Sequence, residues 1–420
     1  MFSTFINAWK VKEIRKKILY TLMILLVVRL GTHIAIPGID VQAIKVARDA
    51  SSTGTLYNII AGGANSAWSI FAMGIGPYIN ASIIMQLLTI AIPKLEQLSK
   101  EGEEGRKKIQ SYSRILTVAL AAIQGTGVTF SYRSIFLIQN IGIYIISVIT
   151  LMAGTTFIMW LAEQISDKGI SNGSSMIIFI NIVSNLPSGI TTLYYYGVAG
   201  EVSNWLKVIG TILILLIVII FIVIVNAGER RLPVQYSNKM AGRGYLRGQN
   251  QFMPIKVNTA GVISIIFAIS LLQFPETIGQ FVRPTGGAFT KLIEFLRMTS
   301  VSGAILYMIL IVFFTYFYTS IVINPNEIAA NMKKNGGFIP GIRPGQPTSN
   351  YITKIVNRIT LVGAISYVII AMIPILLQWI FGISVGFGGT TLIIVVGVCL
   401  DIVKALESQL LMRNYKGFLN

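Results

Sequence analysis

The chain has 420 residues, of which 54% are hydrophobic and only 12% charged, with a mean hydropathy of +0.71 and a net charge of +18. Soluble domains carry about a quarter charged residues, so this composition excludes an ordinary soluble domain and predicts an integral membrane protein. The single cysteine, Cys399, excludes a disulfide framework, and one histidine beside it leaves little for a zinc site. We therefore expect neither a metal nor a cofactor.

Ten apolar stretches are long enough to cross a bilayer, which takes about 20 residues. The first follows the basic segment "KVKEIRKK" and lacks a small-residue cleavage site, so it is interpreted as a transmembrane helix and not as a signal peptide. The fifth is the weakest, because "NGSSMIIFINIVSNLP" is short and polar at both ends. The expected spans lie near residues 18–37, 75–93, 113–130, 141–162, 172–188, 205–226, 259–275, 303–324, 359–380 and 386–404.

Basic residues divide unevenly between the two sides of the membrane. Ten spans place both termini on one side, and if that side is the cytoplasm, the inner segments hold 26 Lys and Arg residues and the outer segments 6. Arg29 and Lys207 lie within or at the edge of spans. The excess agrees with the positive-inside rule. The sequence therefore predicts a multi-pass protein with both termini in the cytoplasm.

The second apolar stretch, "WSIFAMGIGPYINASIIMQLLTIAIP" over residues 68–93, is interrupted by Gly74, Gly76 and Pro77. Just before it lies "IAGGANSA", which is too small and polar to complete a span. A re-entrant segment is tolerated at membrane depth only where protein or water surrounds it. The pattern indicates a broken helix beside a water-filled or protein-lined space.

Two predicted inner loops, about 227–258 and 325–358, are longer than a connection requires, and both are basic with Gly and Pro at turn positions. Long ordered loops are often functional. Either the loops contact anionic lipids alone, or they form a docking surface for a large cytoplasmic partner.

The sequence offers little for catalysis. No GxxxxGK[ST] or HExxH pattern occurs, so we expect no enzyme activity and no catalytic residue. An ion-coupled transporter usually needs ionisable groups near mid-membrane, whereas Glu163, Asp401 and Arg29 lie toward span ends. An uncoupled solute transporter and a membrane-bound assembly scaffold remain as alternatives to a channel.

Several segments resemble signature stretches of the SecY family, in order over residues 60–420. They are "FAMGIGPYINASIIMQLLT", "MWLAEQISDKGISNGSSMIIF", "RRLPVQY", "MPIKVNTAGVISIIFAISLL", "NPNEIAANMKKNGGFIPGIRPG" and "GGTTLIIVVGVCLDIVKALESQLLMRNYKGFL". The resemblance implies an all-α polytopic fold of ten helices in two inverted five-helix halves, 1–190 and 191–420, hinged near 188–204. It also implies an hourglass pore with a re-entrant plug near 58–73 and a lateral gate between spans two and three and spans seven and eight.

The resemblance also assigns roles to residues. It places the pore ring at Ile75, Ile79, Ser174, Ile178, Ile266 and Ile394. It places the plug at Gly62, Gly63, Ala64, Asn65, Ser66, Trp68, Ile70 and Phe71. It places the lateral gate at Asn80, Gln86, Gln124, Gln273 and Phe274. It places contacts with a motor or ribosome at Arg343, Arg230, Arg231, Arg243, Arg247, Lys256, Lys333 and Lys334.

Each assignment has a simpler alternative. Ring isoleucines could face lipid, the plug could be a plain re-entrant turn, gate amides could be helix–helix hydrogen-bonding groups, and the lysines could be topogenic charges. Ser174 departs from the family, whose residue there is usually aliphatic, and either Ser174 thins the ring or a neighbour such as Ile177 substitutes.

The function implied by the resemblance is a protein-conducting channel of the general secretory pathway, in the bacterial cytoplasmic membrane. Energy would come from the SecA ATPase, the membrane potential or the ribosome. Expected partners are SecE, SecG, SecA, the ribosome, signal peptides, unfolded preproteins and anionic phospholipids, with the YidC insertase and SecDF as further candidates.

Overall fold

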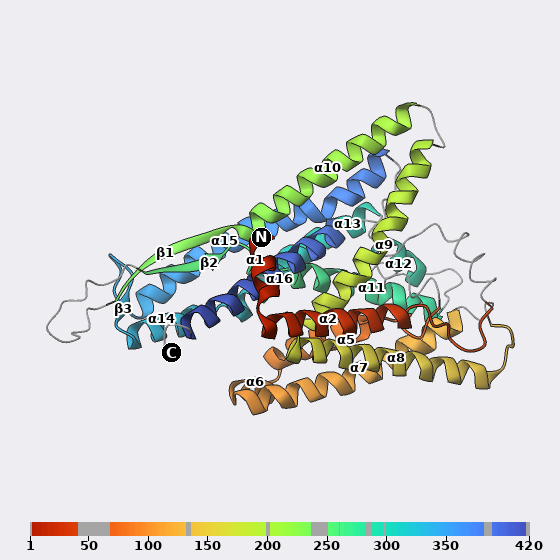
Figure 1. Cartoon of the computed structure of the whole chain (residues 1–420), viewed down its shortest axis with the longest axis horizontal. Coiled ribbons are helices and arrows are strands. Elements are labelled where there is room, and N and C mark those ends of the chain that lie inside the picture. The colour runs from red at the N-terminus through yellow and green to blue at the C-terminus, as the bar shows by residue number, and fades with distance from the viewer. Residues whose placement is uncertain are drawn as a thin grey trace. The chain divides into compact units, whose positions relative to one another are not determined.

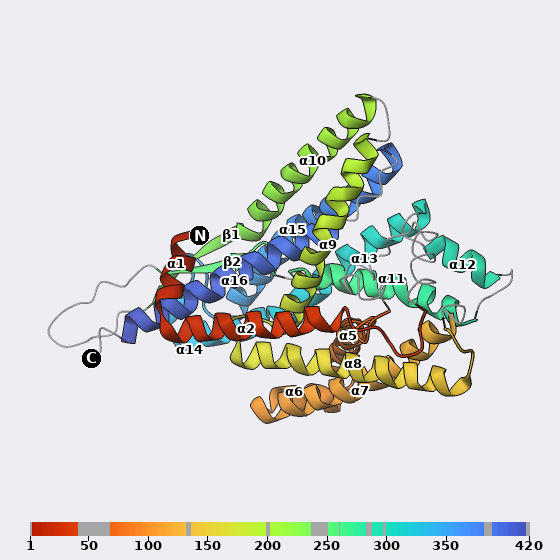
Figure 2. The same cartoon turned by 45° about the vertical axis from the view of Figure 1, so that its right-hand side comes forward.

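The computed structural model describes residues 2–40, 68–131, 136–198, 202–236, 251–259, 261–282, 288–296, 300–381 and 389–416. Within these ranges the protein is mostly helical (Figures 1 and 2). Its residues group into two compact units. Unit 1 comprises Met1–Ile209, Gln273–Glu294 and Leu377–Asn420, and unit 2 comprises Gly210–Leu272 and Phe295–Leu376. Each unit is described by itself.

The described helices range from 8 residues in α6 to 36 residues in α15. Unit 1 contains α1 (Phe2–Lys10), α2 (Lys12–Gly31), α5 (Gly76–Ala91), α6 (Pro93–Lys100), α7 (Glu103–Ser131), α8 (Ile141–Lys168), α9 (Gly173–Val198) and α16 (Gly389–Lys416). Unit 2 contains α13 (Val301–Val322), α14 (Pro325–Lys334), β1 (Glu229–Tyr236), β2 (Gln251–Lys256) and β3 (Gly337–Phe338). Residues of both units occur in α10 (Val202–Ala227), α11 (Ile263–Val282), α12 (Ala288–Leu296) and α15 (Gln346–Phe381).

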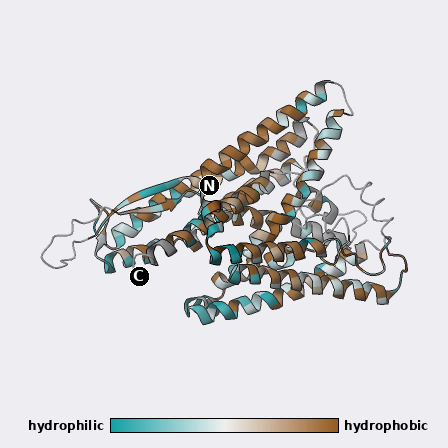
Figure 3. Cartoon of the chain, in the orientation of Figure 1, coloured by the Kyte–Doolittle hydropathy of each residue, from teal (hydrophilic) through white to brown (hydrophobic). Residues whose placement is uncertain are grey.

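Several helices have the length and composition of membrane spans. Among the described residues, five helices qualify, in α8, α9, α10, α13 and α15, and α5 with α6 makes a sixth if this pair, bent by 101°, is one span. Hydrophobic residues fill the middle of α7 and α8, while hydrophilic residues gather at the α6 end of α7 (Figure 3). Each of the ten predicted spans overlaps a helix. The two-halved arrangement of ten spans stays a prediction, and its boundary at residue 190 falls within α9.

The first predicted span ends earlier than expected. The sequence predicts apolar helix to residue 37, but α2 ends at Gly31. The following residues leave the helix because they pair with the segment before α5: the Ile36 amide donates to the Trp68 carbonyl at 2.9 Å, and the Ile70 amide donates to the Ile34 carbonyl at 2.9 Å. A long-range backbone pairing of this kind has no signal in a local hydropathy pattern.

The fifth predicted span is longer than expected. The sequence predicts its end near residue 188, whereas α9 continues through Pro187 to Val198. Proline lacks an amide hydrogen and usually interrupts a helix. Membrane helices tolerate it because neighbouring helices and local adjustments satisfy the freed carbonyl.

The all-α prediction misses a small antiparallel sheet of order β2-β1-β3. Strand β1 pairs with β2 from Glu229↔Lys256 to Val234↔Gln251, and with β3 at Gln235↔Phe338. Each of the two long strands contains a proline, Pro233 in β1 and Pro254 in β2. Proline cannot donate a hydrogen bond to a neighbouring strand, so the local sequence does not predict strands here. The two long basic loops are therefore joined into one folded element.

Candidate functional site

The break in the second apolar stretch is a buried turn. Gly74 takes the left-handed conformation at φ 55°, and α5 begins at Gly76 with Pro77 in its first turn. The Gly74 amide donates to the Phe71 carbonyl at 2.8 Å, which closes the turn before the helix. The predicted interruption by Gly74, Gly76 and Pro77 is thus present, because glycine adopts positive φ without steric cost and proline suits the start of a helix.

The residues just before this turn are fixed by their packing. Trp68 is 4% exposed although its backbone lies at φ 46°, a conformation that large residues rarely adopt. Such strain persists only where surroundings impose it. Here the surroundings are a buried cluster that includes Ile36, Met73, Ala121 and Leu151.

Phe71 anchors the same segment between two helices. Its ring stacks on Phe157 of α8 with centroids 6.1 Å apart, and a Cβ at Gly31 of α2 would overlap it. A Cβ at Gly154 of α8 would likewise overlap the Ile70 carbonyl oxygen. Residues 68–75 are therefore held by α2, α7 and α8. The predicted plug residues Gly62, Gly63, Ala64, Asn65 and Ser66 lie outside the described residues.

The six predicted ring residues all lie near helix starts. Ile75 precedes α5 and is fully buried, and Ile79 is half-buried in the first turn. Ile178 and Ile394 are each 4% exposed, and their helices, α9 and α16, pack against each other in unit 1. Ser174 and Ile266 are half-buried, in the first turns of α9 and α11. Whether the six converge on one pore stays a prediction, because Ile266 belongs to unit 2.

The start of α9 is anchored to α8. The Asn172 Oδ1 accepts from the Ser174 amide at 3.0 Å, and the Gly173 amide donates to Ser166 Oγ at 2.9 Å. A Cβ at Gly173 would overlap the Ala162 carbonyl oxygen. The close approach that glycine permits fixes the depth of Ser174 and Ile178 along the bundle.

Helices of the predicted lateral gate make contacts within each unit. In unit 1, α5 packs along α7, with Asn80 and Gln124 half-buried and Gln86 exposed. In unit 2, Phe267 of α11 makes edge-to-face contacts with Phe314 and Tyr318 of α13, at 5.6 and 6.3 Å between centroids. Gln273 and Phe274 belong to α11, but their side chains lie outside the described part of the chain.

The sheet in unit 2 has a core of its own. Leu232, Val234 and Ile255 from the strands bury against Met332 of α14 and Ile352 of α15. Strand alternation explains the pattern, since Leu232 and Val234 face inward while Arg231 and Pro233 are exposed. The sheet, α14 and the start of α15 therefore form one ordered platform, here called the basic platform.

Arg343 stands on a turn that this platform holds in place. Gly341 and Gly345, on either side of it, have φ of 80° and 108°, values that favour glycine. The Arg343 carbonyl accepts from Thr348 Oγ1 at 2.9 Å, and Ser349 Oγ donates to Asn326 Oδ1 at 2.6 Å. The Arg343 side chain is exposed. The turn therefore presents an exposed Arg343 side chain on a backbone held by hydrogen bonds.

The other predicted contacts that the structure describes are also exposed on the platform. Arg231 Nε pairs with Glu229 Oε1 at 2.8 Å. Arg243 and Arg247 lie outside the described residues. The remaining exposed members are Arg230, Lys256, Lys333 and Lys334.

Sequence reasoning missed an ion pair between α7 and α8 in which the carboxylate is buried and the arginine is partly exposed. Glu163 Oε1 accepts from Arg114 Nε at 2.8 Å and from Gln110 Nε2 at 3.1 Å. Gln110 and Arg114 are four residues apart and therefore share a helix face, which is the only signal that could have indicated the pair.

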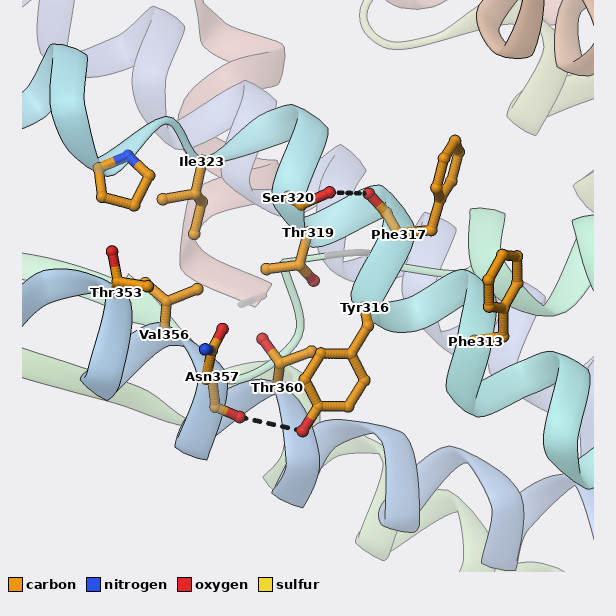
Figure 4. Close-up of a pocket in the computed structure, with 11 residues that line it drawn as sticks. Phe313, Tyr316, Phe317, Thr319, Ser320, Ile323, Thr353, Val356, Asn357 and Thr360 are labelled. Atoms are coloured by element: carbon orange, nitrogen blue, oxygen red, sulfur yellow. Dashed lines mark hydrogen bonds between the residues drawn. The ribbon is translucent and has the colours of Figure 1, made fainter. Parts of the chain in front are cut away.

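A cavity of about 590 Å³ lies between α13 and α15 in unit 2 (Figure 4). Its walls combine the rings of Phe313 and Phe317 with hydroxyls such as Thr319 and Thr360. Tyr316 Oη donates to the Asn357 carbonyl at 3.2 Å along one side. No predicted site residue lines it. Among the described residues, no group of three His, Cys, Asp or Glu side chains could hold a metal ion.

These features define a class of protein: a helical membrane protein with a broken second span and an ordered basic platform formed by two long loops. A family model named SecY matches residues 69–403. The chain is 44% identical to the protein translocase subunit SecY of Streptomyces coelicolor, with 100% of both chains covered. The chain belongs to the SecY family, and the resemblance inferred from its motifs is confirmed.

Two solved structures support the fold. One is described as the structure of a protein conducting channel, with a TM-score of 0.68, 19% identity, and 93% of this chain and 91% of that chain covered. The other is Sec61 in the canine ribosome-channel complex from the endoplasmic reticulum, with a TM-score of 0.65, 18% identity and the same coverage.

Proposed function

We propose that the chain is the channel subunit of a protein translocase, which passes unfolded, signal-bearing polypeptides across the membrane and releases transmembrane segments sideways into lipid. The observation that carries this proposal is the full-length match to a protein translocase subunit, at 44% identity over 100% of both chains. The chain forms the channel and does not itself catalyse a reaction. Energy comes from the SecA ATPase, the membrane potential or the ribosome, and the membrane is the bacterial cytoplasmic membrane with both termini inside.

The pore ring consists of Ile75, Ile79, Ile178, Ile266 and Ile394, with Ser174 as its sixth member. Branched aliphatic side chains are stiff and pack without directional bonds, so they close around any passing chain. A narrow apolar constriction also excludes water and ions when the pore is idle. The near-complete burial of Ile75, Ile178 and Ile394 is consistent with such packing.

The plug is the segment near residues 58–73 that blocks the idle pore. The backbone pairing of Trp68 and Ile70 with residues 34–36, and the packing of Phe71, support a held position for its last part, Trp68 to Phe71. A signal sequence opens the gate by binding the open state better than the closed one, since only differential affinity shifts an equilibrium.

The basic platform binds the cytoplasmic partners. Arg343 is its central contact, because a guanidinium can fork onto a carboxylate or backbone carbonyl and its turn is held rigid. SecA and the ribosome are alternative occupants, and the ribosome is supported by the structural likeness to a channel in a ribosome complex. SecE clamps the two halves, SecG binds at their side, and YidC and SecDF cooperate in insertion and later translocation.

Reconstitution tests the proposal directly. Proteoliposomes containing this chain with SecE receive SecA, ATP and a signal-bearing precursor, and protease is then added outside. We expect ATP-dependent protection of the precursor, at a level comparable with an established SecY complex. An absence of protection under conditions where that complex works would reject the channel in favour of an uncoupled transporter or a scaffold.

A further inference from the structure

Helix α1 leaves two large apolar side chains uncovered. Ile6 is 54% exposed and Trp9 48% exposed, and their spacing of three places them on one helix face. Asn7, between them in sequence, is exposed on a different face. An exposed apolar face on a helix marks a surface that contacts a protein or a membrane.

The opposite side of α1 is already packed. Ala8 is fully buried in a cluster with Ile14 of α2 and Leu406 of α16, and Val11 and Ile402 pack around it. Alanine at this point allows α1 to approach α16 closely. The exposed face carrying Ile6 and Trp9 is therefore a second face of the helix.

The direction of α1 differs from that of the helix it precedes. Val11 takes an extended conformation, with φ −86° and ψ 112°, and separates α1 from α2. In both views α1 runs across the direction of α2, whereas α7 and α8 run alongside α2 (Figures 1 and 2). If α2 enters the membrane, α1 lies along its surface.

Basic residues lie on both sides of Val11, where α1 ends and α2 begins. Five exposed cations fall within eight residues, and Glu13 is the one acid among them. They are Lys10, Lys12, Arg15, Lys16 and Lys17. Basic residues near an anionic leaflet are attracted to its negatively charged surface. Tryptophan is enriched at the membrane–water boundary, where its ring is apolar and its N–H remains hydrated.

We infer that α1 is an interfacial helix that inserts Ile6 and Trp9 into the cytoplasmic leaflet and recruits anionic phospholipids through the cations at its carboxyl end. The cluster of a basic segment beside an exposed Trp and Ile favours an anionic lipid surface over a soluble protein partner. Because Ala8 packs on Leu406, α1 also holds the cytoplasmic part of α16 at a fixed depth.

Depth measurements at adjacent positions test this inference. Cys399 is the single cysteine, so Cys399→Ser gives a background in which Ile6→Cys, Trp9→Cys and the control Asn7→Cys each carry one environment-sensitive fluorophore. The full chain is reconstituted in phosphatidylcholine vesicles with and without phosphatidylglycerol. Quenching by aqueous iodide and by spin-labelled lipid is then measured.

We expect labels at positions 6 and 9 to be several-fold less accessible to iodide than the label at position 7, and to be quenched by spin-labelled lipid. Phosphatidylglycerol should increase lipid quenching at both positions, and Lys16→Gln with Lys17→Gln should remove that increase. Equal iodide quenching at all three positions would overturn the inference. Shielding from iodide without lipid quenching would also overturn it, because protein would then cover the face.

Discussion

Glu163 shows how a single buried carboxylate can position two helices. Its Oε1 accepts from Arg114 and Gln110 of α7, and its side chain is 10% exposed against 48% for Arg114. Removing one partner of a buried pair costs about 3–5 kcal/mol when the other stays buried, and less when that partner can reach water. We therefore expect Glu163→Ala to destabilise the folded protein by about 2 kcal/mol, measured as thermal unfolding in detergent.

Two variants make this result specific. Glu163→Gln keeps an acceptor for Arg114 and should lose less stability than Glu163→Ala. Glu104→Ala, at an exposed position in the first turn of α7, should change stability by no more than about 0.5 kcal/mol. Equal losses for Glu104→Ala and Glu163→Ala would show that the pair is not a specific tie between α7 and α8.

Arg343 gives a prediction about the proposed partners. Its guanidinium is exposed while its backbone is fixed, so Arg343→Glu should leave the fold intact and reverse the charge of the contact. Losing a central contact residue typically costs 2 kcal/mol or more, so SecA-driven translocation should fall about tenfold or more. Lys354→Glu, at an exposed position on α15 outside the predicted contacts, is the matched control. A similar loss from both variants would indicate a general charge effect.

Close packing between α8 and the segment before α5 depends on a glycine of α8. A Cβ at Gly154 would overlap the Ile70 carbonyl oxygen, while one at Gly142 in the same helix would meet nothing within 4 Å. Overpacking costs about 1–3 kcal/mol, so Gly154→Ala should lower the unfolding temperature and raise idle ion conductance by displacing the anchored segment. Gly142→Ala should leave both unchanged. If the idle ion conductance of Gly154→Ala were unchanged, the contact between Gly154 and Ile70 would not contribute to closing the idle pore.

The sequence predicted elements wherever the cause is local. Gly74 and Pro77 determine the break before α5, and runs of apolar residues predicted a helix at each expected span. It failed where the cause lies elsewhere in the chain. The end of α2 at Gly31 depends on pairing with residues 68–70, and β1 with β2 forms despite Pro233 and Pro254 because Leu232 and Ile255 share a core.

The relation between two inverted halves stays a prediction, and two pairs of helices show the pattern that such a relation would produce. Helices α9 and α16 begin with similar sequences, "GSSMII" and "GTTLII". Ile177 and Ile393 are both 0% exposed, and Ile178 and Ile394 are both 4% exposed. Ile79 and Ile266 are likewise the fourth residues of α5 and α11. Spans two and seven, and spans five and ten, are the pairs that inverted halves would relate.

This correspondence also bears on Ser174. Its counterpart at the second position of α16 is Thr390, another small hydroxyl residue, so the two helices carry a hydroxyl side chain at the same position. The two isoleucines one turn further along, Ile178 and Ile394, are the residues of these helices that the ring prediction names.

If the halves are related in this way, Ile178 and Ile394 contribute equally to the idle seal. A polar side chain at a dewetted constriction lets water and ions enter. Ile178→Asn and Ile394→Asn should therefore each raise idle ion conductance several-fold and by similar amounts in planar bilayers, with SecE present. Ile220→Asn, on α10 where the side chain is 61% exposed, makes the same chemical change away from the ring and should not raise it. A leak from only one variant would contradict the symmetry, and a leak from neither would contradict the assignment of the ring to these helices.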